Sequence, residues 1–224
     1  MKIRIIFKQM GSSLVSFIPK HLSPKISFPG IDRVVLTLVL TTSLSCLQEP
    51  VKEDIPELIT KAVLTFTPTA GGPAVVVTAS DPDGEGFQDI SPDGPIILLQ
   101  NSTYNLSVTL INELTDPTSP GYDITDEVRN EGTEHIFFFA WINNLFFAPS
   151  GNGNVDNRND ELIYMDVDTA GLPIGLATNW TTVSAIGTGT FRIMLKHQPG
   201  IKTSTSGSKD GETDLDITFN VEVL

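Results

Sequence analysis

The sequence has a single cysteine, few basic residues and no apolar run long enough to cross a membrane. Among its 224 residues are 1 Cys, 3 His, 14 Lys or Arg and 27 Asp or Glu, which gives a formal net charge of −13. One cysteine excludes an intrachain disulfide framework and the paired-cysteine zinc motifs. The shortage of basic residues argues against nucleic-acid binding, because that binding depends on neutralising phosphates with Lys and Arg.

The longest apolar run leads directly to the cysteine. Residues 33–46 read RVVLTLVLTTSLSC, which is a basic residue, an apolar stretch, small residues and Cys46. A transmembrane helix needs about 20 apolar residues, so this stretch fits instead the apolar region of an export signal. Ser45 before Cys46 is typical of a bacterial lipobox, although Ser43 stands where leucine is usual. We therefore predict a lipoprotein signal peptide over residues 1–45 and lipidation of Cys46.

Two other interpretations of this stretch are a buried cysteine and a core strand, since both are common for a lone cysteine and a short apolar run. The next residues, LQEPVKEDIPE, are polar and contain two prolines, which favours a lipidated tether over residues 46–57. The protein would then be anchored by lipids to the bacterial outer membrane, facing either the periplasm or the outside. The 32 residues before Arg33 exceed a normal basic flank, so either translation starts nearer Arg33 or the leader is unusual.

The chain after residue 45 is strongly acidic and long enough for one domain with a sizeable core. It carries 8 basic and 26 acidic residues, a net charge of −18. Such a balance argues against a basic membrane-binding patch and favours a well-solvated domain or one that collects cations.

Apolar and polar residues alternate repeatedly after residue 57, and no long window has helical periodicity. Alternation with period two is typical of half-buried antiparallel strands. It occurs over residues 62–66, 75–79, 104–110, 163–167, 191–195 and 215–223. The turn residues between these segments predict an all-β, immunoglobulin-like antiparallel sandwich of roughly seven to nine strands. The domain would span residues 58–224 and include one short helical turn capped by Asp123.

Residues 135–142, HIFFFAWI, are apolar on both faces of a strand. This pattern predicts a central strand covered on both sides, or a strand whose outer face meets a loop or a partner, and core packing is the favoured role for its aromatic residues. In the last strand, the alternation predicts that Asp214 and the other polar residues face outward.

Seven phrases occur in order along the chain: ELITKAVLTFTPT, DPDGEG, LINELTDP, DITDEV, GLPIGLAT, MLKHQPG and GETDLDITFNVEV. Together they resemble a group of small uncharacterised lipoproteins of flavobacteria and other Bacteroidetes, over nearly all of residues 57–224. The resemblance implies a cell-envelope β-sandwich lipoprotein of unknown activity. Some members of the group are described as having a type 1 periplasmic-binding fold. That fold needs two lobes of alternating strands and helices, which this sequence does not predict.

The phrase DPDGEG is one motif with metal chemistry. Asp81, Asp83 and Glu85 alternate, glycine follows at the sixth place, and Asp89 adds a further carboxylate, as in the first half of a calcium-binding EF-hand loop. However, Pro92 stands at position twelve, where a bidentate glutamate belongs. A solvated Asp/Gly turn is therefore the alternative.

These patterns predict a lipid-anchored envelope protein with a binding or structural role and no catalysis. Recognition of an envelope protein or a glycan would use the loops at 81–95, 115–132 and 149–160. A second hypothesis is calcium-dependent glycan or surface binding, with exposed Trp141 or Trp180 stacking on sugar. A third is a hydrolase with paired carboxylates. His135 and His197 are expected to begin and end strands as surface or hydrogen-bonded residues.

Overall fold

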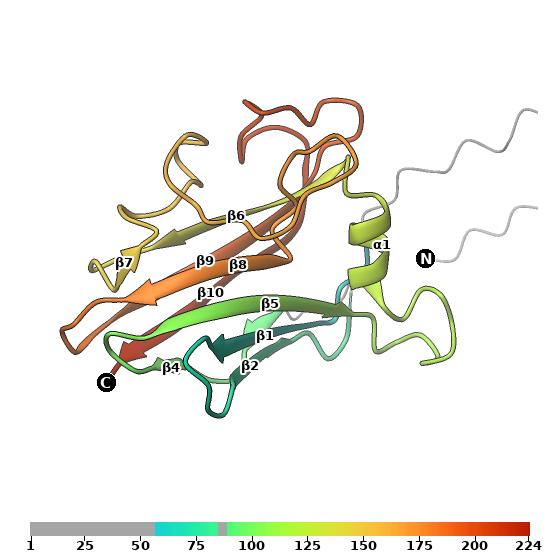
Figure 1. Ribbon diagram of the computed structural model, residues 1–224. Helices are drawn as coiled ribbons and strands as arrows, with labels where there is room; N and C mark the ends of the chain where they lie inside the picture. The colour runs from blue at the N-terminus through green and yellow to red at the C-terminus, as the bar shows by residue number, and fades with distance from the viewer. Residues whose placement is uncertain (1–56, 85–88) are drawn as a thin grey trace, which may run out of the picture. The chain divides into compact units, whose positions relative to one another are not determined.

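The computed structural model of the protein describes residues 57–84 and 89–224 (Figure 1). The predicted signal peptide, the lipidation site Cys46, the tether up to residue 56, and Glu85 of the calcium motif lie outside the described residues. Within them, no helix is long and apolar enough to cross a membrane.

Two sheets face each other and form a sandwich, which confirms the prediction of an all-β fold. The larger sheet has the strand order β3-β2-β1-β5-β8-β7, and the smaller has the order β4-β10-β9-β6. All neighbours are antiparallel except β4 and β10, which run parallel. The strands are β1 (Lys61–Pro68), β2 (Val75–Ser80), β3 (Ser91–Pro92), β4 (Ile96–Leu98), β5 (Thr103–Ile111), β6 (His135–Trp141), β7 (Phe146–Ala148), β8 (Ala177–Thr182), β9 (Gly187–His197) and β10 (Glu212–Val223).

The core lies between the sheets because each long strand is apolar on alternate residues. In β10 every second side chain from Leu215 to Val223 is buried, and the residues between them are exposed or half-buried. β5 has the same pattern over Tyr104 to Leu110. The predicted alternation is therefore confirmed in both strands.

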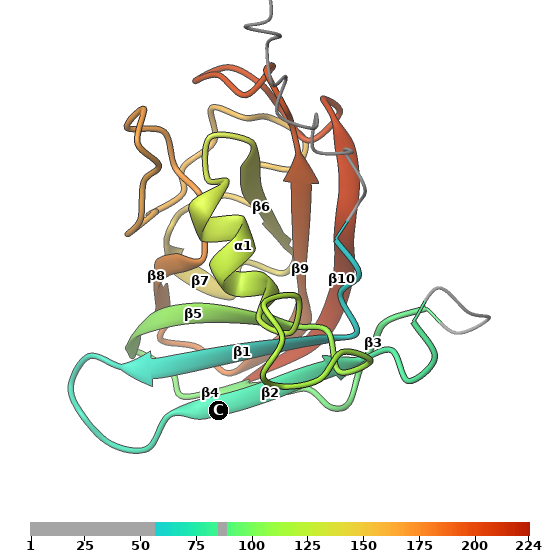
Figure 2. The ribbon, with the colours of Figure 1, turned by 90° about the vertical axis from the view of Figure 1, so that its right-hand side faces the viewer.

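One short helix, α1 (Ile124–Asn130), lies at the end of the sandwich where β5 ends and β6 begins (Figures 1 and 2). As predicted, Asp123 caps it: its side chain accepts hydrogen bonds from the backbone N–H of Thr125 at 3.0 Å and of Asp126 at 3.4 Å. The Thr125 hydroxyl donates to the carbonyl of Leu110 at 3.1 Å. These bonds fix the helix against the end of β5.

Strand β6 is buried on both faces, as predicted, but it lies at the edge of its sheet instead of the centre. Its free edge is covered by the loop after β7, where Asn154 accepts a hydrogen bond from Phe139 N at 3.0 Å. Gly153 makes this approach possible, because a Cβ there would lie 2.0 Å from the Phe139 carbonyl oxygen. Val155 of the same loop packs on the outer face of β6.

Trp141 and Trp180 are core residues, with 2% and 0% of their surface exposed. Their rings meet edge to face at 5.2 Å between centroids. The expectation that either is exposed for sugar stacking is therefore wrong. The reason is that large aromatic side chains lower the free energy most when they fill the space between the two sheets.

Candidate metal centre

The two histidines of the described chain lie side by side at one end of the smaller sheet. His135 is the first residue of β6, and His197 is the last residue of β9. They are direct partners in the strand register, and their rings stack with centroids 4.5 Å apart and planes 3° apart. Both residues are buried. Their places at strand ends are as predicted, but their position beside each other on the core-facing side of the sheet was not.

Two buried carboxylates meet this histidine pair. Nε2 of His135 lies 3.1 Å from Oε1 of Glu57 and 3.8 Å from Oδ2 of Asp214. The side chains of Glu57 and Asp214 are only 4% and 0% exposed. One ligand atom from each of these four residues lies within 4.8 Å of every other. We refer to Glu57, His135, His197 and Asp214 as the histidine cluster.

A β-bulge brings Asp214 into the histidine cluster. Thr213 pairs with Lys196 and Leu215 pairs with Leu195, so Asp214 is an extra residue without a partner in β9. An extra residue interrupts the alternation of side chains and redirects one of them. The prediction that the Asp214 side chain faces outward is wrong for this reason.

The tautomer of His135 directs a lone pair at these carboxylates. Nδ1 lies 3.2 Å from the carbonyl oxygen of Glu131, which can only accept a hydrogen bond, so Nδ1 carries the proton. In the neutral ring, Nε2 then presents a lone pair to the lone pairs of Glu57 and Asp214. Among the described residues, no acceptor lies in hydrogen-bond geometry with Nε2. A proton on Nε2, which makes His135 cationic and pairs it with Glu57, removes this repulsion, and a metal cation between the three side chains would do the same.

Asp214 has the most unfavourable environment in the histidine cluster. Neither carboxylate oxygen has a hydrogen-bond partner within residues 57–84 and 89–224. Burial, together with the negative charge of Glu57, raises the pKa of Asp214 to about 7, despite the opposing effect of the histidines. Burial also opposes the charged forms of Glu57 and His135. Their mutual interaction outweighs it, so the pKa of Glu57 is lowered and that of His135 is raised.

We expect Asp214→Asn to stabilise the metal-free protein by about 1 to 3 kcal/mol at pH 8, because a buried charged group without a partner costs about that much. Urea unfolding measures the change. The control is Asp216→Asn, two residues along β10, where Asp216 pairs with Arg192 at 2.6 Å at the surface. Losing that pair should cost at most about 1 kcal/mol. A lower free energy of unfolding in metal-free Asp214→Asn than in the wild type would contradict the expectation.

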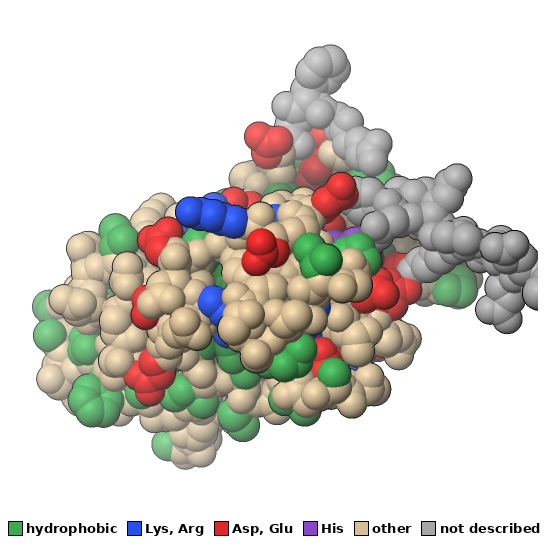
Figure 3. Space-filling view, turned by 90° about the horizontal axis from the view of Figure 1, so that it is seen from above, with side chains coloured by type: hydrophobic (Ala, Val, Ile, Leu, Met, Phe, Trp, Pro, Cys, Tyr) green, Lys and Arg blue, Asp and Glu red, His purple; other side chains and the backbone are tan. Residues whose placement is uncertain are grey.

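Three further acidic side chains extend the histidine cluster toward α1. Oε2 of Glu134 lies 3.4 Å from Nε2 of His197. Glu131 joins Glu134 and His197 in a second group of atoms within 4.8 Å, and Glu57, Glu127 and Glu131 form a third. Figure 3 shows a small histidine surface near acidic side chains in this region. This end of the sandwich is therefore rich in both nitrogen and oxygen ligands.

The predicted calcium motif lies in the segment after β2. Oδ1 of Asp81 accepts hydrogen bonds from the backbone N–H of Asp83 at 3.2 Å and of Gly84 at 2.9 Å, which is an Asx turn. Asp89 is exposed. Calcium binding by this motif stays a prediction.

The acidic residues after β7 have structural hydrogen bonds. Asp168 forms a buried ion pair with Lys202 at 2.9 Å. Asp166 accepts hydrogen bonds from the backbone N–H of Gly175 at 2.8 Å and of Ala177 at 3.2 Å. These carboxylates fix loops that cover the edge of the sandwich.

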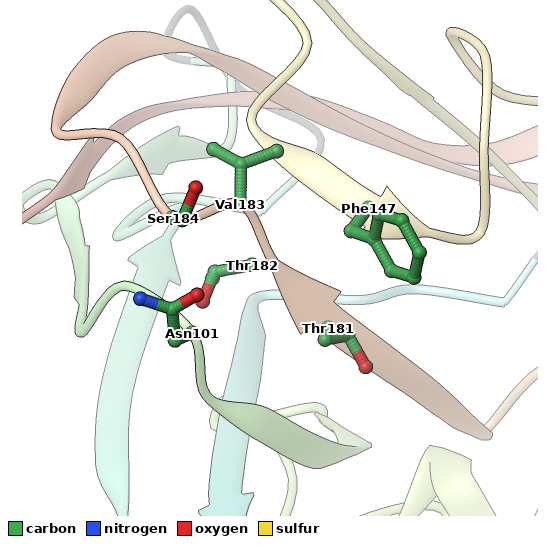
Figure 4. A pocket seen from close by; sticks show the side chains of 6 residues that line it. All are labelled: Asn101, Phe147, Thr181, Thr182, Val183 and Ser184. Carbon is green, nitrogen blue, oxygen red and sulfur yellow. The ribbon is translucent and has the colours of Figure 1, made fainter.

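A hollow of about 370 Å³ lies beside β7 and β8, away from α1 (Figures 1 and 4). It is lined by Asn101, Phe147, Thr181, Thr182, Val183 and Ser184. Phe147 is 75% exposed. The Thr182 hydroxyl donates to the Leu99 carbonyl at 2.6 Å, and the Thr181 hydroxyl pairs with that of Thr103 at 3.0 Å. Two of the polar groups therefore already have protein partners.

Comparison with known proteins gives no match to a family model, a curated protein or a solved structure. The resemblance to flavobacterial lipoproteins stays a prediction from the sequence.

Proposed function

We propose that this chain is a lipid-anchored cell-envelope protein whose β-sandwich binds a divalent transition-metal ion, with zinc as the reference case, in the histidine cluster. The observation that carries the proposal is the fully buried Asp214 carboxylate, which has no hydrogen-bond partner among the described residues and faces a histidine pair. A bound cation would neutralise this carboxylate and use the lone pair of His135.

The spacing of the ligand atoms supports a metal of this class. Zinc binds imidazole nitrogen and carboxylate oxygen at about 2.0–2.2 Å in tetrahedral geometry, which places neighbouring ligand atoms about 3.4 Å apart. The separations of 3.1 Å and 3.8 Å from His135 Nε2 to the two carboxylates lie on either side of that value. The hydrogen bond from Nδ1 to the Glu131 carbonyl is the support that a metal-bound histidine usually has.

The test is a titration of the metal-free protein with zinc against a chromophoric chelator. We expect a Kd below about 1 μM and, at saturating zinc, a rise in melting temperature of roughly 5–10 °C. Magnesium at the same concentration should give no comparable rise, because it prefers oxygen ligands and retains its water. A melting temperature unchanged by zinc would refute metal binding in the histidine cluster.

The lipid anchor is supported by the export-signal pattern before Cys46 and by the polar stretch after it. We expect a fatty-acid probe to label the wild-type protein in cells and to leave Cys46→Ala unlabelled. Protease treatment of whole cells then distinguishes a periplasmic from a surface-facing domain. Equal labelling of the two forms would show that Cys46 is not the anchor.

Calcium-dependent glycan binding has less support as an alternative, because both candidate tryptophans are packed in the core.

A further inference from the structure

We propose that the hollow beside β7 and β8 binds a neutral sugar unit of a glycan, with Phe147 stacking on the sugar ring and Asn101 and Ser184 hydrogen-bonding to its hydroxyl groups. This site is separate from the histidine cluster and needs no metal ion. We call it the Phe147 hollow and define it by the six residues that line it, which are Asn101, Phe147, Thr181, Thr182, Val183 and Ser184.

A β-bulge directs the Phe147 ring into solvent beside this hollow. Phe146 pairs with Thr182 and Ala148 pairs with Thr181, so Phe147 is an extra residue without a partner in β8. A bulge of this kind redirects a side chain and is common next to binding sites. Phe146 is 4% exposed and belongs to the core, whereas Phe147 is 75% exposed. The phenyl ring is therefore available to a ligand.

Two polar side chains of the Phe147 hollow are available as well. The side chains of Asn101 and Ser184 make no hydrogen bond with any residue of the described ranges. The backbone of Asn101 is fixed, because its N–H donates to the Val183 carbonyl at 2.9 Å and its φ of 50° lies in the left-handed region that asparagine tolerates. Figure 4 shows Asn101 and Phe147 on opposite sides of the segment that supplies the other four residues. The hollow thus has an aromatic ring on one side and an amide on the other.

The chain segments that meet at the Phe147 hollow contain no charged residue. They are residues 95–112, 138–155 and 169–191, although 18% of the whole chain is charged. Ligands with phosphate, carboxylate or ammonium groups are usually recognised by opposite charges. A hollow lined only by neutral side chains therefore suits a neutral ligand.

A neutral sugar matches the chemistry of this lining. A pyranose ring has a face of C–H groups that packs on an aromatic ring, and its hydroxyl groups both donate and accept hydrogen bonds. The Asn101 amide and the Ser184 hydroxyl each provide a donor and an acceptor. Apolar walls with a few polar groups that fix orientation are typical of small-ligand sites.

A peptide ligand fits this place less well. Peptides often bind by adding a strand to an open sheet edge, and β7 is the edge strand here. However, β7 has only three residues, and its bulge interrupts regular pairing. Short and bulged edge strands are features that prevent the addition of a further strand.

The test is affinity electrophoresis of the protein in gels that contain laminarin, xyloglucan, galactomannan or glycogen, without added calcium. We expect at least one of these four neutral polysaccharides to retard the wild-type protein, with a Kd below about 1 mM. The anionic polygalacturonate should not retard it. Phe147→Ala should weaken binding at least about 10-fold, because the stacking surface is lost, whereas Phe147→Trp keeps an aromatic ring and should still bind.

Asn101→Gly tests the polar side of the hollow. It removes the amide and keeps the left-handed backbone, which glycine adopts freely. We expect binding to weaken about 3- to 10-fold through the lost hydrogen bonds. The matched control is Ile201→Ala, which removes another exposed apolar side chain, 50% exposed, from the loop after β9. This variant should bind like the wild type.

The possible results distinguish the sugar site from other uses of this surface. No retardation by any of the four neutral polysaccharides would overturn the proposal, and so would equal retardation of the wild type and Phe147→Ala. Self-association that is lost in Phe147→Ala, without glycan binding, would identify a contact between copies of the chain instead. Zinc binding should be the same in Phe147→Ala and the wild type, so the sugar site and the metal site are tested separately. Circular dichroism shows that each variant is folded.

Discussion

Zinc affinity should fall by at least about 100-fold when His135 and His197 are both replaced with glutamine, and the melting temperature of the variant should no longer rise with zinc. Glutamine has a length similar to that of histidine but lacks the imidazole nitrogen that zinc prefers. Glu57 and Asp214 would remain, but two carboxylates alone suit a hard cation better than zinc. The measurement is the chelator competition used for the wild-type protein.

The control for the histidine variant is Asp216→Asn, which changes β10 without touching the histidine cluster. It should keep the wild-type zinc affinity. The single variant His135→Gln tests whether weaker zinc binding comes from loss of a ligand or from loss of the fold. Strands β6 and β9 pair at seven positions, so one change among them should leave the sheet intact. Wild-type zinc affinity in the double variant would place the metal elsewhere.

Trp180→Ala should lower the free energy of unfolding by about 3–5 kcal/mol, since it leaves a large cavity in a packed core. The indole is fully buried between the sheets. Its ring centroid lies 4.8 Å from that of Phe191, 4.9 Å from Phe146 and 5.5 Å from Phe139. Its Nε1–H donates to the Thr178 hydroxyl at 2.7 Å, which would also lose its partner. Urea unfolding of the metal-free protein measures the loss.

Phe147→Ala is the matched control, because Phe147 lies in the neighbouring strand β7 and is 75% exposed. Its replacement should change the free energy of unfolding by no more than about 0.5 kcal/mol. Similar losses in the two variants would contradict the assignment of Trp180 to the core and of Phe147 to the surface.

The strands could be predicted because burial on one face leaves a local pattern. Alternation over Leu215 to Val223 shows which side chains enter the core, and it needs no knowledge of the neighbouring strand. The helix cap at Asp123 is equally local, because the side chain bonds to backbone groups two and three residues later. These parts of the fold depend on interactions within a few residues.

The candidate metal centre could not be predicted because it depends on pairings between distant residues. His135 and His197 become neighbours only through the register of β6 and β9. Asp214 enters the cluster through a bulge, and the sequence around it shows uninterrupted alternation. The one available signal was that each histidine lies at a strand terminus and on the core-facing side of its strand. His135 is two residues from Phe137, and His197 is two residues from Leu195, so each histidine continues an apolar face that leads into the core.

Glu57 links the sequence prediction to the candidate metal centre. It is the last residue of the predicted tether from Cys46, and it belongs to the histidine cluster. Metal binding at Glu57 would fix the point where the tether meets the β-sandwich, just before β1.

The most direct test of the central claim is anomalous diffraction at the zinc absorption edge, from crystals of the protein grown with zinc. We expect one strong peak about 2.0–2.1 Å from Nε2 of His135 and, after the His197 ring rotates out of its parallel stack with His135, from a ring nitrogen of His197, with carboxylate oxygens of Glu57 and Asp214 completing the shell. A zinc-saturated protein with no anomalous peak among these four side chains would contradict the account.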